Sequence, residues 1–157
     1  MEAVSRNPDI DFDAIIGLPA EFSLTTAHAS PSWSGLCVEM DQLRVDRDNL
    51  ATYTLAIAPR AWLATQRKNY RIFQYLSELD IVQKLLGEWN IDAETRVSRS
   101  HKARKYRVQY NETDWAFACR MLEDAGISFF FETSADGTTL VLDDEPQAGQ
   151  LGFPDLD

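Results

Sequence analysis

The sequence of 157 residues is poor in histidine and cysteine, with two of each. A site of the nucleophile–histidine–acid type needs a histidine with an orienting partner. His28 and His101 lie in polar stretches, where we expect ordinary surface residues. A structural zinc site usually needs about four Cys or His ligands at close spacing, which this chain does not offer. Cys37 and Cys119 lie far apart in apolar neighbourhoods, so we expect two free, buried thiols.

Glycine-rich loops and long apolar runs are also missing. The seven glycines are scattered, so no phosphate-binding loop and no cofactor are expected. No apolar run approaches the roughly 18 residues of a membrane span, which argues against stable membrane insertion. Residues 1–13 are polar and acidic and lack the basic start and apolar stretch of a secretory signal peptide. We therefore do not expect export by the ordinary secretory route.

Charge of one sign dominates, because the formal net charge is −10. Such an acidic chain would repel nucleic-acid phosphates, so no nucleic-acid partner is expected. The basic residues gather in the run from Arg96 to Arg107, and the chain beyond Val108 is acidic except for Arg120. Two interpretations stay open. The run is either a solvated loop that nearby acids partly neutralise, or a charged contact with a neighbouring subunit.

The first third of the sequence shows the period of two that is typical of half-buried strands. We expect strands over Ala20–Thr26, Trp33–Met40 and Thr52–Ala58, punctuated by prolines. Four Trp, five Tyr and eight Phe favour packed sheet faces, because aromatic side chains are enriched in strands. This part of the chain therefore predicts a β unit.

The middle predicts a helix that begins after Ser77, with Asp80 placed to complete a capping box. Its apolar stripe consists of Leu79, Val82, Leu85, Leu86 and Trp89. A second helix is predicted after a strand with alternating Tyr106, Val108 and Tyr110. Thr113 is its N-cap, and Gly126 is its left-handed C-cap.

We expect the apolar stripe of the second helix to contain Trp115, Ala118, Met121, Leu122 and Ala125. The chain then predicts a hairpin of Ile127–Thr133 and Thr138–Asp143, with its turn at Asp136-Gly137. The stripe should pack on the sheet residues Phe129, Phe131, Leu140 and Leu142.

Paired carboxylates are the remaining enzymatic option, because two acids suffice for glycoside hydrolysis. Glu112 and Asp114 flank a helix start, where acids stabilise the helix dipole without chemistry. Asp143, Asp144 and Glu145 end a strand, where charge discourages further edge pairing. We therefore expect a structural protein and no enzyme.

Several segments are more specific than composition. The two strongest, taken together, are Arg71-Ile-Phe-Gln and Val108-Gln-Tyr-Asn-Glu-Thr-Asp. The full set comprises residues 11–24, 33–38, 53–63, 71–82, 106–117, 123–132 and 140–144. In this order and at this spacing, the chain from about residue 10 to 145 resembles the N-terminal hub region of VgrG, the spike protein of type VI secretion. It is also similar to the phage tail-hub family.

The resemblance implies a mainly β fold with a few α-helices. It has two barrel-like subdomains of the phage tail-hub type, the second incomplete, with a helical segment between them. The expected divisions are 1–60 for the first subdomain, 61–105 for the helical connection and basic loop, and 106–157 for the start of the second. The family-motif residues are expected to be structural or to lie at an interface: Arg71, Ile72, Phe73, Gln74, Gln109, Tyr110, Glu112 and Asp114.

The resemblance also implies partners and a location. In such proteins three copies form a trimeric adaptor between the Hcp tube and a C-terminal spike domain that carries secreted effectors. Assembly would be cytoplasmic, followed by secretion through the type VI machine. Three alternatives stay open: a tail hub of a contractile phage or phage-like particle, a docking domain of a cell-wall-degrading enzyme, and a monomeric peptide-binding module with a free edge strand.

Overall fold

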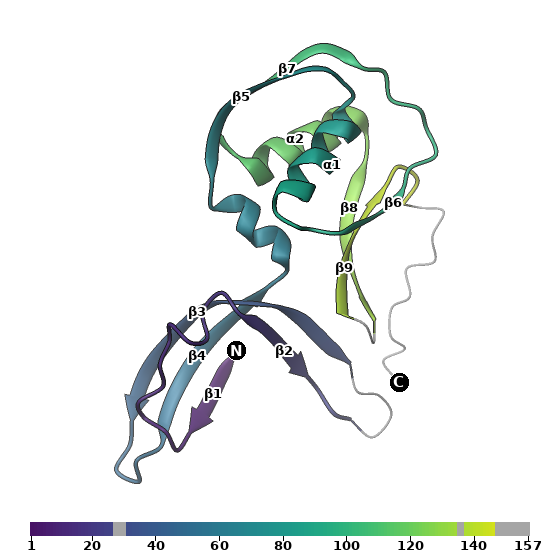
Figure 1. Cartoon of the computed structure of the whole chain (residues 1–157). Helices are drawn as coiled ribbons and strands as arrows, with labels where there is room; N and C mark the ends of the chain where they lie inside the picture. Colours follow the sequence, from purple (N-terminus) through teal and green to yellow (C-terminus); the bar gives the residue numbers. More distant parts are fainter. Residues whose placement is uncertain (27–30, 135–136, 147–157) are drawn as a thin grey trace. The chain divides into compact units, whose positions relative to one another are not determined.

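The computed structural model describes residues 1–26, 31–134 and 137–146 (Figure 1). His28, Asp136 and the chain beyond Pro146 lie outside the described residues. The fold is mainly β with a few helices, as predicted. The chain divides into two compact units. One contains residues 1–62 and 133–138, and the other contains 63–132 together with the chain from 139 on. The predicted boundaries at 60 and 105 stay a prediction.

The first unit is built on a four-stranded antiparallel sheet with the order β1-β4-β3-β2. Its strands are β1 Glu2–Ser5, β2 Pro19–Ser23, β3 Ser32–Val45 and β4 Ala51–Ala58. The long strands β3 and β4 curl into half of a barrel (Figure 1). The three predicted strands of this region are confirmed. β1 is a strand that the sequence pattern does not indicate, because its short polar segment is held by pairing with β4.

The core of the first unit lies on one face of this sheet. Cys37, Met40, Ala51 and Tyr53 are buried there. The segment between β1 and β2 covers them, with Phe12 set edge-on to Tyr53 at 6.1 Å between ring centroids. Burial of these side chains holds the long connection against the sheet, since apolar area removed from water stabilises at about 25 cal/mol per Å².

The second unit follows a 3-10 helix at Arg60–Thr65. It contains a two-stranded antiparallel sheet, a three-stranded sheet with the order β6-β9-β8, and two helices. The bounds are β5 Lys68–Leu76, α1 Glu78–Glu88, β6 Ala93–Arg96, β7 Arg104–Thr113, α2 Asp114–Ala125, β8 Ser128–Ser134 and β9 Gly137–Asp143. The predicted strands at 127–133 and 138–143 are confirmed as neighbours. β5 and β6 lie in a region that the sequence predicted as helix and loop.

Both predicted helices are confirmed, together with their caps. The Ser77 backbone N–H donates to Asp80 Oδ2 at 2.9 Å, and the Asp80 N–H donates to Ser77 Oγ at 3.2 Å, which makes a capping box with aspartate. Thr113 Oγ1 accepts from the N–H of Ala116 at 3.1 Å. Gly126 ends α2 at a φ of 66°, a left-handed conformation that favours glycine.

The core of the second unit lies chiefly between the two helices, which pack against each other beneath β5 and β7. It includes Ile81, Val82, Leu85, Leu86, Phe117, Ala118, Met121 and Leu122. The two thiols are free as expected. Cys37 is buried, whereas Cys119 on α2 is only partly buried.

The predicted stripe of α2 is partly wrong. Phe117, and not Trp115, is the fully buried aromatic, and its ring stacks on that of Phe73 at 5.4 Å. Trp115 is half-buried and meets Phe129 edge-on at 5.1 Å. Phe129 and Phe131 are more than a third exposed, so they do not form the expected floor. The helix turns its buried face toward α1 and Phe73, a partner that β5 supplies.

Candidate functional site

The two strongest motif segments lie side by side on the paired strands β5 and β7. Arg71 is directly opposite Gln109, Phe73 is opposite Arg107, and Gln74 is opposite Tyr106. We call this pair of strands the ribbon. Because successive side chains of a strand point to opposite faces, the pairing sorts the motif residues into an inner set and an outer set. Arg71, Phe73 and Gln109 lie on the inner face, toward the helices.

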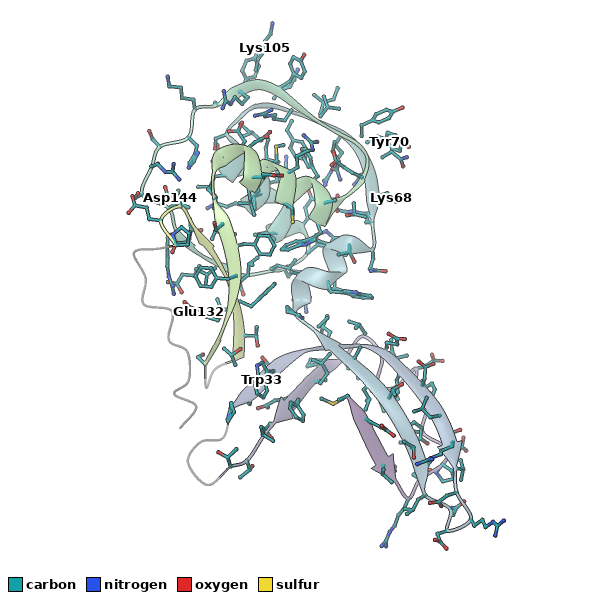
Figure 2. All side chains as sticks on the ribbon, turned by 180° about the vertical axis from the view of Figure 1, so that it is seen from behind. Trp33, Lys68, Tyr70, Lys105, Glu132 and Asp144 are labelled. Carbon is teal, nitrogen blue, oxygen red and sulfur yellow. The ribbon has the colours of Figure 1, made fainter. Side chains whose placement is uncertain are left out.

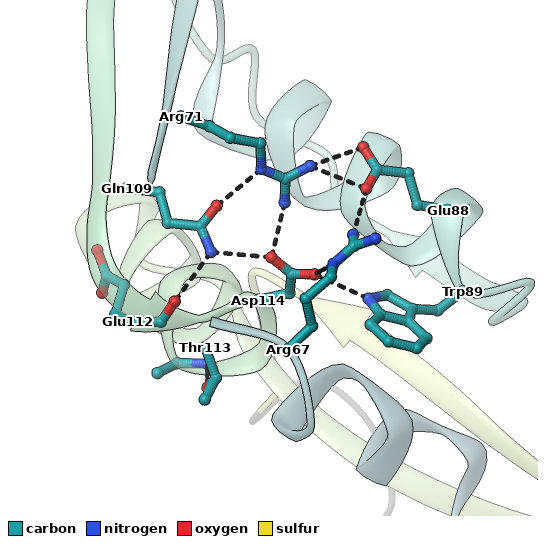
Figure 3. A network of polar contacts seen from close by, with 9 residues as sticks. Arg67, Arg71, Glu88, Trp89, Gln109, Glu112, Thr113 and Asp114 are labelled. Carbon is teal, nitrogen blue, oxygen red and sulfur yellow. Dashed lines mark hydrogen bonds and ion pairs between the residues drawn. The ribbon is translucent and has the colours of Figure 1, made fainter. Parts of the chain in front are cut away.

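The inner face is organised around the carboxylate of Asp114, the first residue of α2, whose side chain is fully buried (Figure 3). Asp114 Oδ2 accepts from Arg67 Nε at 2.7 Å and from Trp89 Nε1 at 3.0 Å. Asp114 Oδ1 accepts from Arg71 Nη2 at 2.7 Å and from Gln109 Nε2 at 2.8 Å. Four donors from three different segments therefore converge on one acid.

The electrostatics of Asp114 follow from this geometry. Burial alone would raise the pKa of the carboxyl, because it disfavours the charged form. Hydrogen bonds from Gln109, Arg67 and Trp89 and the charge of Arg71 outweigh burial, so the pKa is lowered from its usual value. The acid is therefore held as a carboxylate. A buried charge of this kind is tolerated because it is paired and hydrogen-bonded.

Glu88, the last residue of α1, extends the network. It accepts from Arg71 Nη1 at 2.8 and 2.9 Å and from Arg67 Nη2 at 2.6 Å. The Arg67 guanidinium also lies 4.8 Å from the centroid of the Trp89 ring. The end of α1, the start of α2 and strand β5 are thus joined at one point. Arg67, Glu88 and Trp89 are not among the predicted site residues.

Glu112 is held locally. Arg120, two turns along α2, donates to its carboxylate at 2.5 and 3.3 Å. Gln109 Nε2 donates to the Glu112 carbonyl oxygen at 3.1 Å. Both carboxylates of the predicted pair are therefore bound by arginines: Glu112 by Arg120, and Asp114 by Arg67 and Arg71.

A second buried acid lies at the start of the other helix. Glu78, the first residue of α1, is 2% exposed and accepts from Arg104 Nε at 2.8 Å and from Arg107 Nε at 3.1 Å. Burial opposes ionisation of Glu78, yet these hydrogen bonds lower its pKa. Both helices therefore begin with a buried carboxylate that binds two arginines. In each position the helix dipole adds to the stabilisation of the negative charge.

The basic run is largely neutralised within the chain. Besides Arg104 and Arg107, Arg96 pairs with Glu94 and Glu132 at 2.7 Å. Arg99 pairs with Asp144 at 3.0 Å. The backbone N–H groups of Ser98 and Arg99 also donate to Asp144, which lowers the pKa of that carboxyl. Asp144 thus fastens the loop between β6 and β7. The loop interpretation is only partly right, because Arg96 lies on β6, and Arg104 and Arg107 lie on β7.

The outer face of the ribbon is different. Ile72, Gln74 and Tyr110 of the motifs lie there with Tyr70, Tyr106 and Val108, and all six are exposed. Tyr70 points away from the helices (Figure 2), and its ring meets that of Tyr110 edge-on at 5.2 Å. The motif residues therefore divide into buried anchors and an exposed apolar surface.

Within residues 1–26, 31–134 and 137–146, no three Cys, His, Asp or Glu side chains are arranged to hold a metal ion. An open groove at the end of α2 is lined by Cys119, Leu122, Glu123 and the segment 126–129, with a single carboxylate and no histidine. Neither of the described helices has the length and apolar character needed to cross a membrane.

This fold and this pair of motifs define a class. The chain belongs to the phage tail baseplate hub (GPD) family, whose model matches residues 1–154. It is 32% identical over 152 residues to the type VI secretion system spike protein VgrG1b of Pseudomonas aeruginosa. The matched region covers 96% of this chain and 20% of VgrG1b. The spike protein VgrG5 of the same organism is 33% identical over 162 residues, or 99% of this chain and 19% of that protein.

Solved structures agree. The E. coli c3393 protein, a type VI secretion component described as similar to the T4 tail proteins gp27 and gp5, is 27% identical. The structural match has a TM-score of 0.83 and covers 91% of this chain and 40% of the c3393 chain. The 43 kDa tail protein of prophage MuSo2 from Shewanella oneidensis shares the fold, with a TM-score of 0.54 at 10% identity over 73% of this chain and 36% of that one. The resemblance to the VgrG hub region is confirmed. The chain spans about a fifth of the length of the curated relatives it matches.

Proposed function

We propose that this chain is the hub part of a VgrG-like type VI secretion spike. Three copies would form an adaptor between the Hcp tube and a puncturing needle that carries effectors. Assembly would take place in the cytoplasm, and the spike would leave through the type VI machine. The likeness to spike proteins over nearly the whole chain is the observation that supports this proposal most.

The inner face of the ribbon fits a mechanical role. Two buried acids fasten both helices to β5 and β7, so the exposed outer face is carried on a rigid support. Rigid presentation of a surface lowers the entropy cost of association. We propose no catalytic role. Peptidoglycan-hydrolase activity that survives purification and disappears in Glu112→Ala would contradict this part of the proposal.

Assembly is tested by sedimentation velocity over a wide concentration range. We expect the complete gene product to be a stable trimer, and the 157-residue chain alone to be monomeric or weakly associating. A complete product that stays monomeric at tens of micromolar would overturn the trimeric adaptor. Binding to Hcp is tested by co-purification with the Hcp of the same strain, and secretion by the loss of Hcp from the medium when the gene is deleted.

A second candidate is the tail hub of a contractile phage or phage-like particle. The family description and the fold of the Shewanella prophage tail protein favour it. The two candidates differ in the assembled product. Induction of the strain should release tailed particles that contain this protein in the phage case, and Hcp without such particles in the secretion case.

A further inference from the structure

The outer face of the ribbon is an unusual surface for a folded chain. Tyr70 lies opposite Tyr110, Ile72 opposite Val108, and Gln74 opposite Tyr106. The three tyrosines are 61–75% exposed and Ile72 is 67% exposed. Cross-strand pairs of this kind form a continuous strip that is apolar except for the amide of Gln74, because opposite side chains on one face lie about 5 Å apart. None of the six carries a charge.

The extent of this strip corresponds to an interface. A fully buried aromatic side chain contributes about 150–250 Å². At the observed exposures, the six side chains of the strip present on the order of 500–600 Å². The largest patch of an ordinary monomer is about 300–600 Å². One side of a standard protein interface is about 800 Å². The strip therefore lies at the upper end of the range for a monomer's largest patch and supplies more than half of one side of a standard interface.

The rim of the strip indicates the charge of that partner. Lys68 lies at one end of the ribbon and Lys105 near the other (Figure 2). In the part of the chain that the structure describes, neither lysine makes an ion pair, whereas the arginines of the ribbon are bound to Glu78, Glu88 and Asp114. An apolar strip with a cationic rim is complementary to a surface with acids at its edge.

The chain itself carries the complementary charge. Its net charge is −10 although the two ribbon strands carry five basic residues and one acid, so the rest of the chain is more acidic still. We propose that the outer face of the ribbon is the surface through which one copy of this chain contacts a second copy. This inference rests on the proposed assembly of several copies and names the residues that make it.

Photocrosslinking tests the occupant directly. p-Benzoylphenylalanine is incorporated at position 110 of the complete gene product, and the same probe at Gln83, an exposed position on α1, is the control. Copies labelled with nitrogen-14 and nitrogen-15 are mixed, allowed to exchange and irradiated. Mass spectrometry should find adducts that join the two labels at position 110 and not at position 83. Adducts within one polypeptide only would show that another segment of the same chain covers the strip, and would overturn the proposal.

Charge insertion gives an independent measurement. In the complete gene product, Ile72→Asp and Tyr110→Asp should each weaken self-association at least about tenfold, as measured by sedimentation velocity. The reason is that central apolar side chains carry most of the binding energy of an interface. Because both positions are exposed, the melting temperature of the 157-residue chain should stay within about 2 °C of the parent. Gln83→Asp is the control and should associate normally.

The outcomes separate this inference from the proposed function. A trimeric parent whose ribbon variants associate with unchanged affinity would overturn the ribbon surface and leave the hub function standing. A monomeric parent protein would contradict the proposed hub assembly, and therefore also the proposed contact between copies. Variants that lose association while they keep their melting temperature support the ribbon as the contact between copies.

Discussion

Arg71 and Gln109 lie directly opposite each other on β5 and β7, and Arg71 Nε donates to Gln109 Oε1 at 2.9 Å. Both side chains then bind the same oxygen of Asp114. The amide of Gln109 uses its oxygen for the arginine and its nitrogen for the acid, so its orientation is set by the network. This closed triangle joins the two motif segments at Asp114, the last residue of the second segment.

Removal of the central acid should therefore be costly. Asp114→Ala leaves Arg67 and Arg71 without their buried partner. Loss of one member of a buried ion pair costs roughly 3–5 kcal/mol. We expect the free energy of unfolding, measured by urea denaturation, to fall by about 3 kcal/mol or more. Glu123→Ala on the exposed side of α2 is the control, with a change within about 0.5 kcal/mol. Equal urea midpoints for the two variants would refute the anchoring role of Asp114.

The same acids predict the response to pH. The pKa values of Asp114 and Glu78 are lowered in the folded chain. Their stabilisation is therefore complete above the unfolded value, about 4, and is lost as pH falls through the lower folded values. The urea midpoint should decrease between about pH 5 and pH 2. Asp114→Asn should reduce this slope, whereas Glu123→Gln should keep it. An unchanged slope in Asp114→Asn would argue against the assigned shift.

The core between the helices gives a third prediction. Met121 is fully buried, so Met121→Asp places a charge among apolar side chains without a partner. The expected loss is roughly 3–5 kcal/mol, or failure to fold. Ala116→Asp is the matched control, because Ala116 is exposed in the first turn of α2, where an acid suits the helix dipole. The denaturation midpoints of both variants, measured in urea, test this placement of Met121. A normal midpoint for Met121→Asp would mean that α2 packs differently.

Two glycines should respond in opposite directions to the same substitution. Gly126 has a φ of +66°, where a side chain is strained, so Gly126→Ala should cost about 1 kcal/mol. Gly87 lies within α1, and a Cβ added there meets no atom within 4 Å. Gly87→Ala should therefore stabilise by up to about 1 kcal/mol, since alanine is the better helix former. Thermal unfolding followed by circular dichroism measures both, and a shift of the same sign in the two variants would contradict this assignment.

Much of the fold was accessible from the sequence because local signals were strong. Ser77 with Asp80, and Thr113 with Gly126, define both helices by capping chemistry alone. β5 was missed because its outer residues are exposed and apolar, so Tyr70, Ile72 and Phe73 show no polar–apolar alternation. Phe117 was missed for a related reason: its partner Phe73 lies on that unrecognised strand.

The polar anchors were only partly accessible. The motifs pointed to Arg71, Gln109 and Asp114, but not to their common contact, which depends on the register of β5 with β7. Arg67 carried no local signal. Glu88 did carry one, because a carboxylate at the end of a helix is disfavoured by the dipole unless a cation binds it. Glu78 resembled an ordinary acid in a first helical turn, and its burial could not be inferred before Arg104 and Arg107 were placed.

The parallel pairing of β6 with β9 bears on how the chain acquires its fold during synthesis. Ala93 pairs with Leu140, so the strand at 93–96 has no sheet partner until nearly all of the described chain has left the ribosome. Contacts between residues far apart in sequence form slowly, because the intervening loop must close first. β6 must therefore remain without a sheet partner until β9 has been synthesised. A ribosome stalled before residue 140 would hold a nascent chain that protease can still cut within β6.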